Sequence, residues 1–236
     1  MDSNSSYALR LTDFSYAWPG QPALFHVASL SLPQGQHLFI QGPSGCGKST
    51  FLSLIAGVQS VQSGECMVLE KSMASLSPTQ RDRLRGEHMG VIFQQFNLLP
   101  YLGIQANLLL PVRLFASRAQ DSAQQWGDPV SQARALSQSL GLPDSHWNQP
   151  VHQLSVGQQQ RVAIARALMQ KANVILADEP IASLDPESAR IVMETLRDIN
   201  QNDGITVVVT LHQVDYALRY CPRAIAMQAG RIVYDG

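Results

Sequence analysis

A glycine-rich segment between an apolar strand and a helix constrains this chain most. Residues 42–50 read Gly-Pro-Ser-Gly-Cys-Gly-Lys-Ser-Thr and fit the pattern GxxxxGK[ST]. They follow the apolar run HLFI and precede the helical pattern STFLSLIAG. Glycines let successive backbone N–H groups curl around an anion, and the start of a helix adds positive potential. The segment therefore predicts a phosphate-binding loop in an α/β core. A turn that only caps a helix is the alternative.

Two side chains in this loop carry chemistry that a backbone cannot supply. Lys48 places a point charge at the β- and γ-phosphates of a nucleotide, and Ser49 offers a hydroxyl to Mg²⁺. We expect Cys46 to be a small tolerated residue rather than a redox switch. The other residues expected to contact the nucleotide here are Gly42, Pro43, Ser44, Gly45, Cys46, Gly47 and Thr50.

A second motif places two carboxylates at the end of a buried strand. The run VILA at 174–177 leads directly into Asp178 and Glu179. Asp178 is placed to organise Mg²⁺, and Glu179 is placed to polarise an attacking water, because phosphoryl transfer needs a positioned nucleophile. A solvated acidic turn is the alternative for this motif alone. Together with Lys48, the pair predicts nucleotide hydrolysis.

A third motif, LSVGQQQR, opens a helix expected over 157–170. Ser155 can cap that helix, and Gly157 allows a phosphate to approach the backbone. Such a helix spans roughly 20 Å, and Asp178 follows its far end after a short connection. We therefore expect that this motif does not reach the nucleotide held by Lys48 of the same chain. It would instead serve a second copy of the chain.

Strand-like and helix-like runs predict the organisation of the chain. The second half alternates buried strands with helices, which indicates a parallel sheet. Residues 97–153 are rich in proline and helical runs, so we expect a helical subdomain inserted into a single domain, 1–236, whose core is 1–96 and 154–236. Strands are expected at 7–12, 23–30, 36–41, 64–70, 89–93, 174–178, 205–210, 223–228 and 231–234, and helices at 78–86, 103–116, 130–140 and 157–170, with another opening at Asp185-Pro186.

Composition excludes several other classes of protein. The formal net charge is −1 and no basic block occurs, which argues against a nucleic-acid partner or a polybasic membrane anchor. No apolar run reaches the roughly 18 residues of a membrane span, and the first ten residues do not resemble an export signal. Three widely spaced cysteines fit neither a disulfide framework nor a zinc site, and suit a reducing cytoplasm.

These motifs together resemble the ATP-binding cassette family over nearly the whole chain. LSVGQ resembles the family signature, usually LSGGQ, with Val156 as the departure. The resemblance implies a P-loop NTPase fold of the α/β class, with an antiparallel β part near the N-terminus and an inserted helical subdomain. It also implies that Ser155, Gly157 and Gln158 contact ATP.

The resemblance implies four further roles. Gln94, in the sequence Phe-Gln-Gln, would sense the metal and the attacking water. Asp185 would belong to the D-loop while also capping a helix, and His212 would contact the γ-phosphate. Tyr16 would stack on adenine, with Trp18 as the second candidate. With Lys48 and Glu179, Gln94 and His212 complete the expected catalytic set; Ser49, Gln94 and Asp178 would hold the metal.

The function that the resemblance implies is that of the ATP-binding and ATP-hydrolysing subunit of a bacterial transporter. It would use ATP and Mg²⁺, form a homodimer with ATP sandwiched between the copies, and act on separate integral membrane permease subunits from the cytoplasmic face of the inner membrane. A soluble cassette ATPase uncoupled from transport is the alternative from another class, although such proteins usually carry coiled-coil insertions or tandem cassettes. A nucleoside kinase would lack LSVGQ.

Two subgroups of the family compete for the chain. The N-terminal two-thirds, above all 86–158, resembles the lipoprotein-releasing and macrolide-export group, whereas residues 172–221 resemble the phosphonate-importer ATPase. In this family a membrane subunit docks between the core and the helical subdomain, near 94–116 and 130–153. The sequence therefore predicts an export- or release-type permease, with phosphonate import as the alternative.

Overall fold

An antiparallel sheet begins the chain. The structure, a computed structural model, describes residues 6–170 and 172–236. The first sheet has the strand order β2-β1-β4-β5, and β1 pairs with both β2 and β4 in antiparallel register. Its strands are β1 (Tyr7–Ala17), β2 (Ala23–Pro33), β4 (Ser63–Val68) and β5 (Lys71–Ser72). This is the antiparallel part predicted near the N-terminus.

A second sheet of largely parallel strands forms the centre of the molecule. Its order is β10-β9-β3-β8-β7-β6, and only the pair β10–β9 is antiparallel. The strands are β3 (His37–Gln41), β6 (Met89–Ile92), β7 (Val174–Asp178), β8 (Thr206–Thr210), β9 (Arg223–Gln228) and β10 (Arg231–Asp235). The predicted α/β class is thereby confirmed.

Both faces of this second sheet are buried along its central strands. Along β7, Val174 and Leu176 belong to the apolar core shared with the first sheet, whereas Ile175 and Ala177 belong to a second core on the opposite face. Helix α1 (Lys48–Ile55) lies within the first core, where the Phe51 ring packs edge-on against the rings of the first sheet. Strands that are buried on both faces have almost continuously apolar sequences, which explains the run VILA at 174–177.

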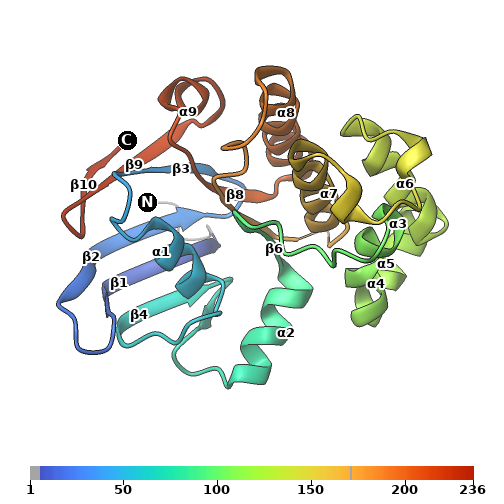
Figure 1. Cartoon of the computed structure of the whole chain (residues 1–236). Helices are drawn as coiled ribbons and strands as arrows, with labels where there is room; N and C mark the ends of the chain where they lie inside the picture. Colours follow the sequence, from blue (N-terminus) through green and yellow to red (C-terminus); the bar gives the residue numbers. More distant parts are fainter. Residues whose placement is uncertain (1–5, 171) are drawn as a thin grey trace.

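The remaining helices lie against the sheet or in a group beside α7 that continues the second core (Figure 1). Helices α7 (Val156–Leu168), α8 (Pro186–Asp203) and α9 (Val214–Tyr220) contribute to the second core, while α2 (Pro78–His88) leads into β6. The group at the right of the view lies beyond α7 and consists of α3 (Ile104–Leu108), α4 (Leu110–Leu114), α5 (Ala116–Trp126) and α6 (Pro129–Ser139).

The helices differ from the sequence prediction where proline or polarity intervenes. The helix expected over 103–116 is broken into α3 and α4, because Pro111 has no N–H to continue the helical hydrogen bonds. Helices α5 and α9 were not predicted, since α5 is rich in polar residues and α9 is only 7 residues long. The predicted start of α2 is confirmed: Ser77, the N-cap, and Gln80, in the first turn, form a capping box.

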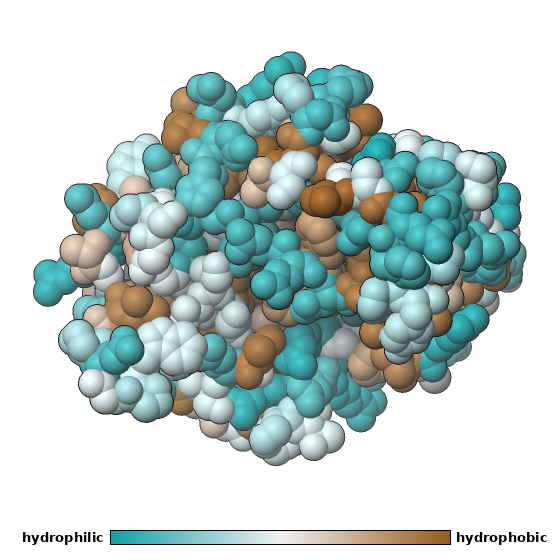
Figure 2. Space-filling model, viewed as in Figure 1, coloured by the Kyte–Doolittle hydropathy of each residue, from teal (hydrophilic) through white to brown (hydrophobic). Residues whose placement is uncertain are grey.

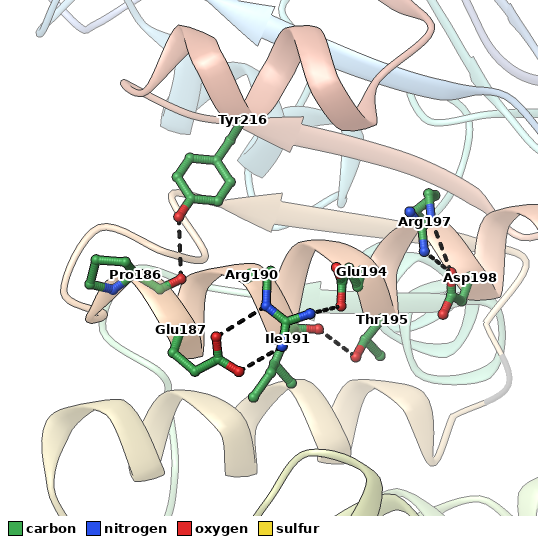
Figure 3. A network of polar contacts seen from close by, with 9 residues as sticks. All are labelled: Pro186, Glu187, Arg190, Ile191, Glu194, Thr195, Arg197, Asp198 and Tyr216. Atoms are coloured by element: carbon green, nitrogen blue, oxygen red, sulfur yellow. Dashed lines mark hydrogen bonds and ion pairs between the residues drawn. The ribbon is translucent and has the colours of Figure 1, made fainter.

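Polar contacts lie along one side of α8 (Figure 3). Arg190 donates to Glu187 and Glu194 within the helix, and Tyr216 of α9 donates to the carbonyl of Pro186 over 3.3 Å. Exposed ion pairs of this kind stabilise a helix weakly. The hydrogen bond from Tyr216, in contrast, connects α9 to the first turn of α8.

Hydrophilic side chains cover most of the face in Figure 2, and apolar residues appear there only in small patches. Within the described residues, none of the helices has the length and apolar character needed to cross a membrane.

A buried histidine should make the stability of this fold pH-dependent. His37 is 1% exposed and its Nδ1 has no hydrogen-bond partner. Burial lowers the pKa of His37 to about 4, whereas an unfolded histidine titrates near 6.5. Between these values the unfolded chain binds a proton that the folded chain does not. The free energy of unfolding should therefore fall as pH falls, by about 2 kcal/mol from this residue between pH 6.5 and 5.

Urea unfolding of the wild type, His37→Gln and His26→Gln at both pH values would measure this. The His37→Gln variant should lose less stability on acidification, while His26→Gln, a change at an exposed position, should follow the wild type. Equal losses in all three proteins would show that His37 does not cause the dependence.

Candidate functional site

The predicted phosphate-binding loop connects β3 to α1. Gly45 and Gly47 have φ angles of 77° and 98°, a region that residues with a Cβ rarely adopt. A side chain at Gly42 would come within 2.6 Å of the Cys46 sulfur. The tight curl of this loop therefore depends on glycine at these positions, as the motif predicted.

Lys48 lies inside the loop rather than in solvent. Its Nζ donates to the carbonyl oxygens of Gly42 and Pro43 over 2.8 and 3.2 Å, and the residue is 5% exposed. No side chain caps the start of α1 at Gly47. A cation and the uncapped N–H groups of a helix start thus lie together, which is an arrangement that binds anions.

Ser49 and Asp178 come from different elements but line the same small cavity, together with Phe93 just before Gln94. A hydroxyl and one carboxylate suit Mg²⁺, which is usually held by one or two protein oxygens while nucleotide phosphates supply others. The described part of the chain contains no group of three His, Cys, Asp or Glu side chains that could hold a metal alone. The residues present therefore fit a magnesium ion that binds together with a nucleotide.

Glu179 and His212 are in direct contact. Oε1 of Glu179 lies 2.7 Å from Nε2 of His212, and the side chains are 15% and 45% exposed respectively. Glu179 has a φ of 50°, and its N–H donates to the backbone oxygen of Thr210 over 3.1 Å. His212 also lines an open cleft with Gly42 and Pro43 of the phosphate loop. The structure thus brings these two predicted residues together beside the loop.

Gln94 is exposed in the segment that follows β6. Two residues further on, Phe96 and Asn97 have positive φ angles of 58° and 49°. The guanidinium of Arg166, in α7, donates to both of their carbonyl oxygens, over 3.0 and 2.6 Å. Burial lowers the pKa of Arg166. Sequence reasoning missed this anchor, because an arginine inside a helix carries no distinguishing signal.

Three predicted nucleotide contacts also serve as helix caps. Ser155 and Gln158 form a capping box at the start of α7, with Ser155 Oγ accepting from the Gln158 N–H and Gln158 Oε1 accepting from the Ser155 N–H. Asp185 accepts from the N–H of Ser188 at the start of α8, and hydrogen bonds with Ser188 lower the pKa of Asp185. Val156, the departure from the signature, is 51% exposed.

Helix α7 starts close to the acidic residues of its own chain, so the prediction from helix length that its start lies far from them is wrong. Since α7 connects to β7 through residues 169–173, the helix and the strand run in opposite directions, and the start of α7 returns to the edge where β7 ends. Gln160 of α7 in fact donates to the carbonyl of Pro180, just after Glu179. The contact of α7 with β6 lies at the other end of the helix, where Ala167 faces Gly90.

Tyr16 does not present an open ring for adenine. It is 6% exposed, its ring stacks on Phe25 with centroids 6.2 Å apart, and its hydroxyl lies 2.5 Å from Oε1 of Gln59. Trp18 packs edge-on against Tyr16 and is 38% exposed. Trp18 is therefore the more accessible of the two aromatic candidates.

Known proteins resemble this chain over most of its length. The sequence model of the ABC transporter family matches residues 25–182. The phosphonates import ATP-binding protein PhnC of Escherichia coli strain K12 is 51% identical over 222 residues, which cover 92% of this chain and 84% of that protein. A protein of the same name from Shigella dysenteriae serotype 1 is 49% identical over 224 residues, with the same coverage of both chains.

Solved structures show the same fold. A dimeric bacterial ABC transporter cassette superposes with a TM-score of 0.84 at 31% identity, covering 97% of each chain. A dimeric ATP-binding cassette in a post-hydrolysis state, bound to ADP and inorganic phosphate, gives a TM-score of 0.82 at 31% identity, again covering 97% of each chain.

The comparisons support the resemblance to phosphonate importers. The match to PhnC extends over 92% of the chain and is not confined to residues 172–221. The export-type reading of the N-terminal two-thirds has no such support. With a family match over more than half of the chain and a phosphate loop of the predicted geometry, this chain belongs to the ABC transporter family, as an ATP-binding cassette that hydrolyses ATP to power transport.

Proposed function

We propose that this chain is the ATPase subunit of a phosphonate importer. The observation that carries the proposal is 51% identity to PhnC across 92% of the chain. In this proposal the chain binds separate integral membrane permease subunits and associates peripherally with the cytoplasmic face of the inner membrane. The lipoprotein-release and macrolide-export reading is the weaker alternative, because it rests only on a sequence resemblance in the N-terminal two-thirds of the chain, above all 86–158.

The proposed site divides its roles among the residues described above. Residues 42–50 surround the phosphates of ATP, with the charge of Lys48 directed at them. Ser49, Asp178 and Gln94 would hold Mg²⁺, which neutralises charge on the phosphates when it is bound. Glu179 orients the attacking water and accepts its proton, and His212 contacts the γ-phosphate.

We further propose that the chain forms a homodimer in which each copy completes the site of the other. Ser155, Gly157, Gln158 and Asp185 of one copy would contact ATP held by the phosphate loop of its partner. Two structural neighbours at 31% identity are described as dimers.

The division of the chain completes the proposal. Residues 97–153 would act as a helical subdomain of the single domain 1–236, and the permease would dock near 94–116 and 130–153. Two large apolar side chains in the first of these ranges are exposed: Tyr101 is 69% exposed and Leu114 is 72% exposed. Apolar side chains left in solvent near a proposed docking region are suited to contact with a partner protein.

Replacement of Glu179 by Gln should separate ATP binding from hydrolysis. The amide cannot accept a proton from water, so turnover should fall by at least about 100-fold, while ATP binding persists and the ATP-bound dimer accumulates. Lys48→Ala should lose ATP binding itself. Steady-state ATPase rates and size-exclusion chromatography with ATP measure these effects.

The double variant Glu179→Gln, Ser155→Arg is the matched control for the dimer. It should bind ATP and remain monomeric, because arginine at the signature blocks contact with the partner's phosphates. Hydrolysis at the wild-type rate in Glu179→Gln would contradict the role of Glu179. An unchanged dimer in the double variant would contradict the role of Ser155.

Trp18, rather than Tyr16, should contribute to adenine binding. Stacking of an aromatic side chain on a base is worth about 1–3 kcal/mol, so Trp18→Ala should weaken ATP affinity by roughly ten-fold. Tyr16→Phe removes only the hydroxyl that contacts Gln59 and should bind ATP like the wild type. Titration with a fluorescent ATP analogue measures both. Normal affinity in Trp18→Ala would return the role to Tyr16.

Co-expression with candidate permeases tests the proposed function as a whole. The chain should co-purify with a phosphonate permease, and its ATPase rate should rise in that complex. A lipoprotein-release permease serves as the matched comparison and should neither co-purify nor stimulate hydrolysis. Stable, stimulated association with the release-type permease alone would overturn the proposal.

A further inference from the structure

Thr210 is the last residue of β8, and its side chain contacts both Asp178 and Glu179. It is fully buried, and its Oγ1 donates to Oδ1 of Asp178 over 2.8 Å. The same oxygen accepts the backbone N–H of Glu179 over 3.0 Å. A hydroxyl has one proton to donate and two lone pairs to accept with, so one oxygen can make both bonds at once.

The first of these bonds fixes the orientation of Asp178. The two residues are direct partners in the parallel pairing of β7 with β8, which places their side chains on the same side of the sheet. Hydrogen bonds to a carboxylate are stronger than those between neutral groups. Within the described ranges, the other oxygen of Asp178 has no protein donor, and the residue lines the cavity that also contains Ser49.

The second bond supports the backbone of Glu179. A residue with a Cβ seldom adopts a φ of 50° unless its surroundings hold it there. Both the hydroxyl and the backbone oxygen of Thr210 accept the Glu179 N–H, over 3.0 and 3.1 Å. Two residues later along the same connection, His212 contacts the Glu179 carboxylate. Thr210 and His212 therefore hold the consecutive acidic residues from one side.

We propose that Thr210 is a positioning residue for ATP hydrolysis. Its hydroxyl orients Asp178 toward the magnesium ion that accompanies ATP, and it holds the backbone conformation that aims Glu179 at the attacking water. This inference rests on the roles proposed above for Asp178 and Glu179. Groups that orient metal-binding side chains typically change metal affinity or activity by about 10- to 100-fold when they are removed.

The test compares three variants of the full chain. Thr210→Val keeps the shape of the side chain but removes the hydroxyl, and Thr210→Ser restores it. Thr206→Val is the matched control, because Thr206 is equally buried in the same strand but its hydroxyl accepts the N–H of Gly35, at the other end of the strand. Thermal unfolding of each variant identifies effects that are due to stability alone.

Binding of a fluorescent ATP analogue is measured in Mg²⁺ and in EDTA, alongside the ATPase rate as a function of Mg²⁺ concentration. Thr210→Val should need about ten-fold more Mg²⁺ for half-maximal activity and should lose most of the gain in analogue affinity that Mg²⁺ provides. Its affinity in EDTA should match the wild type. Thr210→Ser and Thr206→Val should keep the wild-type Mg²⁺ dependence.

A wild-type Mg²⁺ dependence in Thr210→Val would overturn the inference, and so would a failure of Thr210→Ser to restore it or the same loss in Thr206→Val. A different variant tests the proposed role of Asp178 independently of Thr210. If an Asp178→Asn variant responds to Mg²⁺ like the wild type, the role of Asp178 itself is wrong, whatever Thr210 does.

Discussion

Burial of the parallel sheet on both faces is the constraint on which the rest of this structure depends. Alternate residues of β7 and β8 belong to two different apolar cores, so neither face can carry a polar functional group without cost. Polar side chains must therefore be placed where the strands end. Asp178 and Thr210 occupy such positions, and the phosphate loop begins where β3 ends. The common direction of these strands brings the three ends to one edge of the sheet.

This arrangement explains how residues far apart in the sequence form one site. The order β3-β8-β7 puts the strand that carries Thr210 between the strand that leads to Lys48 and the strand that carries Asp178. Helix α1 packs in the core that the two sheets share. Its burial fixes the position of the phosphate loop, which leads into the first residue of the helix. Side chains from three elements can then meet with little flexibility between them. Hydrolysis of ATP requires such fixed positions more than it requires unusual chemistry.

Sequence patterns predicted those parts of the site that depend on local rules. The glycines of the phosphate loop, the acidic pair after VILA and the helix cap at Ser155 are each determined by backbone geometry or by burial, which leave a pattern in consecutive residues. The break at Pro111 was also visible in the sequence, and the prediction of one helix ignored it. The roles assigned to individual residues in ATP binding and hydrolysis remain predictions that the experiments above would test.

Contacts between distant segments left no such pattern. The bonds from Arg166 to Phe96 and Asn97, and from Gln160 to Pro180, join residues whose proximity only the folded chain creates. Burial of Tyr16 beneath Trp18 likewise depends on the packing of rings from separate strands and α1. The orientation of α7 relative to β7 could have been deduced from the short connection between them. The length of α7 did not predict how far its start lies from Asp178. Because the helix and the following strand run in opposite directions, the chain returns along the strand to the level at which the helix began.

The position of Lys48 has a consequence for the thermodynamics of nucleotide binding. Its ammonium group is held by the carbonyl oxygens of Gly42 and Pro43, so the loop encloses a cation of its own chain. These two contacts restrict the conformations of the loop independently of any phosphate, which lowers the conformational entropy that nucleotide binding must remove. What the phosphate must do is compete with two carbonyl oxygens for the ammonium protons. The enthalpy of that exchange, rather than the folding of a flexible loop, should dominate the heat of binding at this end of the nucleotide.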